Sequence, residues 1–255
     1  GEGMLRFLTA GESHGPVLAA ILEGMPSGVP MDLPRLQREM RRRQLGYGRG
    51  PRMQFETDTV ELLSGLRRGR TLGSPIALVI KNKDASIDRL PVVTQPRPGH
   101  ADLIGAMKYD HRDIRNVLER ASARETAARV AVGALCQQLL SQLGIELASH
   151  VIALGSVRAK VPAGLTVARL RARADATPLR CLDAAATKRM ISEINGCMKR
   201  GDTLGGIFEV LIEGVPPGLG SYVHYDRRLD AILGRAILSI HAVKAVEVGD
   251  GVLAA

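Results

Sequence analysis

The chain has 255 residues, of which 45% are hydrophobic, and 35 Lys and Arg residues against 26 Asp and Glu give it a formal net charge of +9. The hydrophobic fraction suffices for a packed core, and no apolar run is long enough for a membrane span. The charge points to an anionic partner, while only 3% aromatic residues argue against stacking on single-stranded nucleic acid. Three widely spaced cysteines and the absence of a signal-peptide pattern predict a cytoplasmic protein.

Short strands and helices follow one another without regular βαβ alternation, which predicts an α+β fold. A helix is expected from Asp32, as N-cap, to about Gln44, with Pro34 in its first turn. A second, shorter helix is expected to follow the Pro98-Gly99 turn. The strands expected in this half are 5–10, 17–23, 59–64 and 75–81.

The longest predicted helix begins near Ser122 and stops at Gly144, a typical residue after a helix end. Ser122 followed by Glu125 fits a capping box. Apolar residues cover much of the circumference of this helix, so we expect it to be an inner layer with sheet packed against it. The later elements are expected to be a strand over 145–157, a helix over 183–199, a strand over 206–213 and a helix over 227–239.

Two histidines lie in polar segments framed by glycine, His14 in residues 11–16 (GESHGP) and His100 in residues 97–102 (RPGHAD). Turns hold polar side chains where a ligand can reach them, and histidine exchanges a proton near neutral pH. A lone histidine is more often structural, but two with the same framing favour proton transfer. No metal-binding spacing such as HExxH occurs, so no metal site is expected.

Arginines cluster in two places. Residues 46–52 form a glycine-rich loop in which Arg49 is expected to bind a ligand, because its planar fork matches carboxylate and phosphate oxygens. Arg120 and Arg124 flank the start of the long helix, where free amides and positive charge suit an anion. For that helix start, a structural cap and an anion site are equally favoured.

Six short segments in order resemble the chorismate synthase family over essentially the whole chain. They are residues 11–15 (GESHG), 41–50 (RRRQLGYGRG), 97–102 (RPGHAD), 119–126 (ERASARET), 201–206 (GDTLGG) and 243–249 (VKAVEVG). The resemblance implies a single domain over 1–255 that lacks the family's C-terminal part, and a β-α-β sandwich with helices between antiparallel sheets. It also implies a homotetramer.

The same resemblance implies a lyase of the shikimate pathway that eliminates phosphate from 5-enolpyruvylshikimate 3-phosphate to form chorismate. Reduced FMN would be required, and NADPH is a candidate reductant. The expected partner is thus a small anionic substrate rather than nucleic acid or a membrane.

Matching the motifs residue by residue assigns the site. His14 would be the general acid toward the departing phosphate, and His100 would lie against the flavin. The residues assigned to the substrate are Arg43, Arg49, Arg52, Arg97 and Arg124, of which Arg43 and Arg49 also match positions for NADP. Those assigned to FMN are Arg120, Ala121, Ser122, His241 and Ala242.

Three features depart from the family pattern: the C-terminal arginine-aspartate signature is absent, Asp84 to Thr94 spans fewer residues than usual, and His241 stands where Asn or Pro is common. The second departure predicts residues missing between Asp84 and Thr94. Two other functions remain open from the residues alone. A basic protein that binds a polyanion would show steep salt dependence, and a phosphoryl-transfer enzyme would use His14 as a nucleophile.

Overall fold

The computed structural model describes residues 5–50 and 56–254. They form two compact units that divide between Glu213 and Gly214. The second unit contains the helix α8 (Leu229–Leu238) and the 3-10 turns η3 (Tyr225–Arg227) and η4 (Gly251–Ala254). Among the described residues, no helix is both long and apolar enough to cross a membrane.

A four-stranded antiparallel sheet forms one layer of the first unit. Its order is β1 (Arg6–Ala10), β2 (Val17–Glu23), β6 (Ile76–Lys81) and β3 (Val60–Leu62). Leu18 pairs with Ile80 and Ala20 with Leu78, and all four side chains are buried, so one face of the sheet forms core. The predicted glycine-rich turn between β3 and β6 contains a small hairpin of β4 (Leu66–Arg67) and β5 (Arg70–Thr71).

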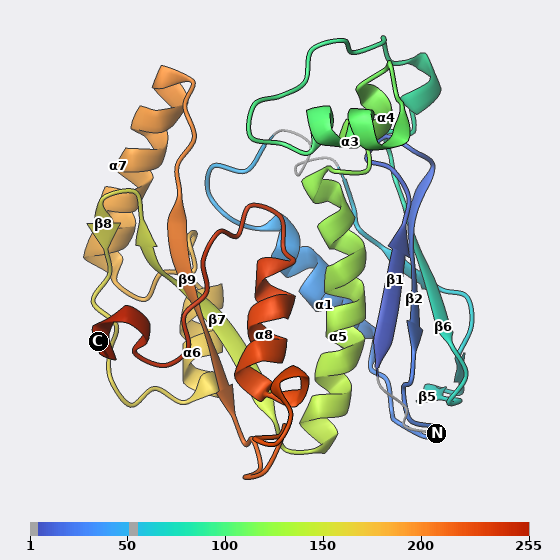
Figure 1. Cartoon of the computed structure of the whole chain (residues 1–255). Helices are drawn as coiled ribbons and strands as arrows, with labels where there is room; N and C mark the ends of the chain where they lie inside the picture. Colours follow the sequence, from blue (N-terminus) through green and yellow to red (C-terminus); the bar gives the residue numbers. More distant parts are fainter. Residues whose placement is uncertain (1–4, 51–55, 255) are drawn as a thin grey trace. The chain divides into compact units, whose positions relative to one another are not determined.

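Two helices pack on that buried face. Helix α1 (Leu33–Gln44) begins as predicted, with Asp32 Oδ1 accepting a hydrogen bond of 3.0 Å from the Arg35 amide. Helix α5 (Thr126–Gln142) lies beside α1, and only its last residue is exposed. One hydrophobic cluster joins both helices to the sheet, which confirms that the long helix is an inner layer (Figure 1).

The capping box expected at the start of this helix is wrong. Ser122 Oγ accepts from the Arg124 amide, and Ala123–Glu125 form a 3-10 turn, η2. The Glu125 carboxylate instead accepts hydrogen bonds from Thr9 Oγ1 at 2.7 Å and from Arg129 Nε at 2.9 Å. A hydroxyl from β1 and a guanidinium one turn along the helix are better partners for a carboxylate than its own helix start.

A second antiparallel sheet lies on the other side of α5, in the order β8 (Val157–Arg158), β7 (Glu146–Leu154) and β9 (Gly206–Glu213). The strand predicted over 145–157 is therefore a hairpin, which turns at Gly155 with φ of 56°. Helix α7 (Ala184–Arg200) was predicted, whereas α6 (Val167–Asp175), packed on β7, was not. Helices between two antiparallel sheets confirm the predicted β-α-β sandwich (Figure 1).

Short elements carry the polar loops of the first unit. They are η1 (Ile87–Arg89), α3 (Asp102–Tyr109), as predicted, and α4 (Arg115–Leu118), which residues 119–122 connect to η2 and α5. The loop between β1 and β2 contacts the end of α4, because the Ser13 amide donates a 2.9 Å hydrogen bond to the Glu119 carbonyl. This contact places the first histidine segment beside the residues that open α5.

Candidate active site

The His14 loop can form only because Gly11 turns it. Gly11 has φ of 102°, and a Cβ atom there would lie 2.3 Å from the Val17 carbonyl oxygen. The His14 amide then donates to Glu119 Oε2 at 2.8 Å. The His14 ring nitrogen Nδ1 lies 2.9 Å and 3.0 Å from the two oxygens of the same carboxylate.

The environment of the His14 imidazole is asymmetric. On the Nδ1 side, the fully buried Glu119 carboxylate also accepts a 3.1 Å hydrogen bond from Arg115 Nη1. On the Nε2 side, Asp84 Oδ2 lies 3.8 Å away, and 27% of the His14 side chain is exposed. The buried carboxylate therefore holds the Nδ1 edge of the ring closely, and the side chain as a whole stays partly exposed.

The His100 segment is built differently. His100 is exposed, and its Nδ1 lies 2.9 Å from the Pro98 carbonyl oxygen. In the same segment, Arg97 donates from Nε and Nη2 to both oxygens of the buried Asp102, at 2.8 Å and 2.9 Å. These hydrogen bonds lower the pKa of Asp102 and raise the pKa of Arg97.

Arg97 also connects the two histidine segments electrostatically. After the effects of Asp102 and of burial, the charge of Glu119 further raises the pKa of Arg97. The charge of Glu119, which holds His14, therefore acts on Arg97, three residues before His100.

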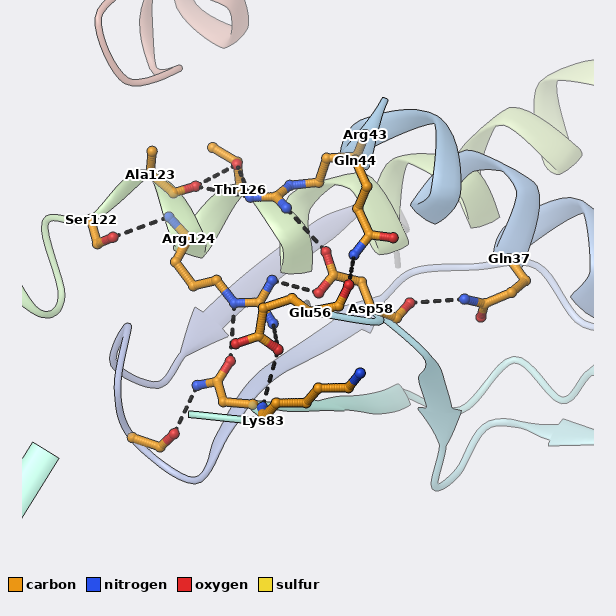
Figure 2. A network of polar contacts seen from close by, with 12 residues as sticks. Gln37, Arg43, Gln44, Glu56, Asp58, Lys83, Ser122, Ala123, Arg124 and Thr126 are labelled. Carbon is orange, nitrogen blue, oxygen red and sulfur yellow. Dashed lines mark hydrogen bonds and ion pairs between the residues drawn. The ribbon is translucent and has the colours of Figure 1, made fainter. Parts of the chain in front are cut away.

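A buried network joins two of the predicted substrate-binding arginines (Figure 2). Asp58, fully buried, accepts hydrogen bonds from Arg43 Nη1 at 3.0 Å and from Arg124 Nη1. Arg124 Nε donates to Asn82 Oδ1 at 3.0 Å, and Arg124 Nη2 lies 3.7 Å from Glu56 Oε2. The network connects α1, the start of α5 and the ends of two strands of the first sheet.

The two arginines of this network differ in what they offer a ligand. Arg124 Nη2 is buried and has no hydrogen-bond partner among the described residues. Arg43 is 12% exposed, and its Nη2 donates to the Ala123 carbonyl and to Thr126 Oγ1. Burial lowers the pKa of Arg43, Asp58 raises it, and the charges of Arg124 and Arg49 lower it further. Two guanidinium groups therefore share one buried carboxylate, and the charge of a third, Arg49, acts on Arg43.

The remaining predicted residues occupy varied positions. Arg49 is exposed and donates from Nε to the Leu45 carbonyl, whereas Arg120 donates to the Thr9 and Gly11 carbonyls and so fastens the end of β1. Ala121 and Ser122 lie in the turn before α5. Arg52 lies outside the described residues, and His241 and Ala242 belong to the second unit.

The acidic partners in this site were not assigned from the sequence. Glu119 opens one of the recognised segments, so its position was a usable signal, but Asp58 and Glu56 lie in a stretch without turn or helix cues. Within the described part of the chain, no group of three or more His, Cys, Asp or Glu side chains is arranged to hold a metal ion.

The chain is similar in sequence to known proteins. The family model described as chorismate synthase matches residues 5–255. A chorismate synthase of Symbiobacterium thermophilum is 54% identical over 268 residues, which cover 98% of this chain and 68% of the relative. Chorismate synthase 2 of Bacillus cereus is 51% identical over 267 residues, with the same coverage. Both alignments are longer than this chain, so each relative has residues in the aligned region that the chain lacks.

The fold is shared as well. A crystal structure of a chorismate synthase superposes with a TM-score of 0.84 at 44% sequence identity, covering 98% of this chain and 70% of that chain.

Proposed function

Because this chain belongs to the chorismate synthase family and is thereby a lyase of the shikimate pathway, we propose that it eliminates phosphate from 5-enolpyruvylshikimate 3-phosphate to form chorismate. The substrate has two carboxylates and a phosphate. The observation that carries the proposal is a histidine held by a buried carboxylate, in a unit that also gathers arginines around Asp58. A leaving phosphate needs these two things, a proton donor and fixed positive charge.

His14 would donate a proton to the departing phosphate from Nε2. Glu119 occupies the Nδ1 edge, whereas Nε2 lies on the other edge, 3.8 Å from Asp84 Oδ2, and the side chain is partly exposed. Transfer of a proton by a positioned side chain contributes about 10²- to 10⁴-fold to a rate.

Arg43, Arg49, Arg97 and Arg124, together with Arg52 by its matching position, would bind the substrate's carboxylates and phosphate. Arg49 and Arg97 suit direct contact, because Arg49 is exposed and the Arg97 side chain is 42% exposed. Arg124 is buried, so it would contribute its field and the one Nη2 group that has no hydrogen-bond partner in the described residues.

The family implies reduced FMN as cofactor, and the donor set suits its anionic groups. The cationic and turn residues at the start of α5 are Arg120, Ala121 and Ser122. His241 and Ala242 match family positions for FMN by sequence. His100, exposed on its turn, would lie against the flavin ring. Reduced flavin, when bound, supplies electron density that no side chain offers.

Several further properties belong to the same proposal. NADPH would reduce the flavin, with Arg43 and Arg49 as its contacts. The protein would be a cytoplasmic homotetramer that binds neither nucleic acid nor membranes. The net charge of +9 would then favour the binding of anionic small molecules.

The test is an anaerobic assay of chorismate and phosphate release with added reduced FMN. We expect both products in equal amounts, and only when the flavin is present and reduced. Equal turnover without any flavin would refute the proposal. Accumulation of phosphohistidine would favour His14 as a nucleophile, and salt-sensitive binding of polyanions without turnover would favour the polyanion-binding alternative.

A further inference from the structure

The function proposed above gives Glu119 no role of its own, although its carboxylate contacts both the backbone and the ring of His14. Its carboxylate accepts from the His14 amide at 2.8 Å and meets Nδ1 at 2.9 Å and 3.0 Å. We propose that Glu119 is a positioning residue, which keeps the Nδ1–H of His14 toward its own carboxylate and Nε2 toward the substrate. This inference rests on the proton-transfer role of His14.

The contact determines where the ring carries its proton. An ionised carboxylate only accepts hydrogen bonds, so Nδ1, at 2.9 Å from Glu119, must bear hydrogen, whereas Asp84 Oδ2 lies 3.8 Å from Nε2. A neutral ring then has its lone pair on Nε2, and a protonated ring presents Nε2–H as the acid. Arg115 Nη1, 3.1 Å from Glu119 Oε1, places a positive charge beside this carboxylate.

The ring is also fixed in direction, because Glu119 holds the backbone and the side chain of His14 together. The Glu119 carbonyl accepts from the Ser13 amide, and Oε2 accepts from the next amide along the loop. Rotation of the imidazole away from Glu119 would leave a fully buried carboxylate with fewer donors, which is costly. The Nε2 edge therefore keeps one orientation relative to the β1–β2 loop.

Glu119→Gln is the direct test, because it keeps the shape of the side chain and removes its charge. Three donors, the His14 amide, His14 Nδ1 and Arg115 Nη1, would then compete for one amide oxygen. We expect kcat to fall by about 10- to 100-fold, a part of what general acid catalysis contributes, while KM changes by less than about threefold. Loss of positioning affects the transition state more than substrate binding.

A spectroscopic measurement separates positioning from folding. In protein with ¹⁵N-labelled histidine, the His14 ring of the unaltered chain should show hydrogen on Nδ1 in its neutral form, and Glu119→Gln should reduce that preference. If Glu119→Gln does not fold, Glu119→Asp keeps the charge on a shorter stem, and we expect its kcat to lie between those of the wild type and an inactive His14→Ala variant. An Nε2–H tautomer in the unaltered chain, or full kcat in Glu119→Asp with the Nδ1–H preference lost, overturns the proposal.

The chain contains a matched control. His150 Nε2 lies 2.8 Å from Glu209 Oε2, a carboxylate–histidine contact between β7 and β9. Glu209→Gln should alter the His150 signals and leave kcat unchanged. If it lowers kcat as much as Glu119→Gln, the effect is not specific to His14 and the inference fails.

The failure of this inference differs from failure of the proposed function. If His14→Ala is inactive while Glu119→Gln keeps full kcat and the Nδ1–H tautomer, only the positioning role is refuted. If His14→Ala keeps full activity, the proposed proton donor is wrong and the role of Glu119 falls with it.

Discussion

The fold holds its two candidate catalytic histidines in opposite ways. His14 is tied to one buried carboxylate through its amide and its ring, whereas the exposed His100 ring has one hydrogen bond among the described residues, to the carbonyl two residues before it. The firm anchor suits a proton donor, which needs a fixed direction. The exposed turn suits a group that meets a ligand surface, since it can adjust when that ligand binds.

Removing the firmly held ring should produce the largest effect. In His14→Ala the proton donor is lost, and we expect kcat to fall by about 10²- to 10⁴-fold. Phosphate release with reduced FMN measures the loss, and a substrate-binding titration checks that affinity is nearly unchanged. Activity within about threefold of the unaltered chain would show that His14 is not the proton donor.

The arginine network tests whether firm anchoring extends beyond His14. Asp58→Asn leaves Arg43 and the buried Arg124 without their shared carboxylate, and breaking a buried ion pair costs about 3–5 kcal/mol. Urea unfolding should show that loss. The exposed Arg228–Asp230 pair offers a comparison, because Asp230→Asn should leave the unfolding midpoint unchanged.

His100 should show the reverse balance. His100→Ala removes an exposed ring, so we expect the free energy of unfolding to change by less than about 0.5 kcal/mol. Turnover should still fall, by about 10- to 100-fold, if the ring meets the flavin. Thermal unfolding and the flavin-dependent assay on one sample measure both. A large loss of stability would mean that this ring is structural.

Acid titration should give the smallest effect. Hydrogen bonds from Arg97 lower the pKa of Asp102, so this pair stabilises the fold above about pH 4, the ordinary aspartate value, and the stabilisation is lost as pH falls through the lowered folded pKa. We expect Asp102→Asn to cost about 1–2 kcal/mol at pH 7, because Arg97 is partly exposed. Unfolding measured from pH 7 to pH 2 should show the difference between variant and wild type shrinking. A constant difference would contradict it.

Local signals predicted much of this fold. The N-cap of α1, the short strands β1 and β2 on either side of the His14 loop, and the all-round apolar pattern of α5 are properties of short stretches. Helix α6 was missed because four of its nine residues are charged, although Thr166 caps it and Val167, Leu170 and Ala174 are buried. Packing on β7 stabilises this helix, and the composition of α6 alone does not reveal that contact.

The candidate site likewise contains residues that local sequence signals indicated and residues that they did not. Glycine framing singled out His14 and His100, because turn chemistry is local. Glu119 lies 105 residues from His14, and Asp58 lies 66 residues from Arg124. Nothing in the residues around Asp58 indicates which guanidinium it will meet, so the acidic half of the site needed the three-dimensional structure.

Residues 119–124 also fix the spacing of the site, because three of them anchor different parts of it. Glu119 holds the imidazole, Arg120 reaches the carbonyls of Thr9 and Gly11, and Arg124 enters the Asp58 network, so one short stretch sets the spacing between acid and cation. A single residue inserted between Glu119 and Arg124 would keep every side chain, but Glu119 and Arg124 could no longer both reach their partners, His14 and Asp58. Mutational drift in this stretch should therefore favour replacement over insertion or deletion.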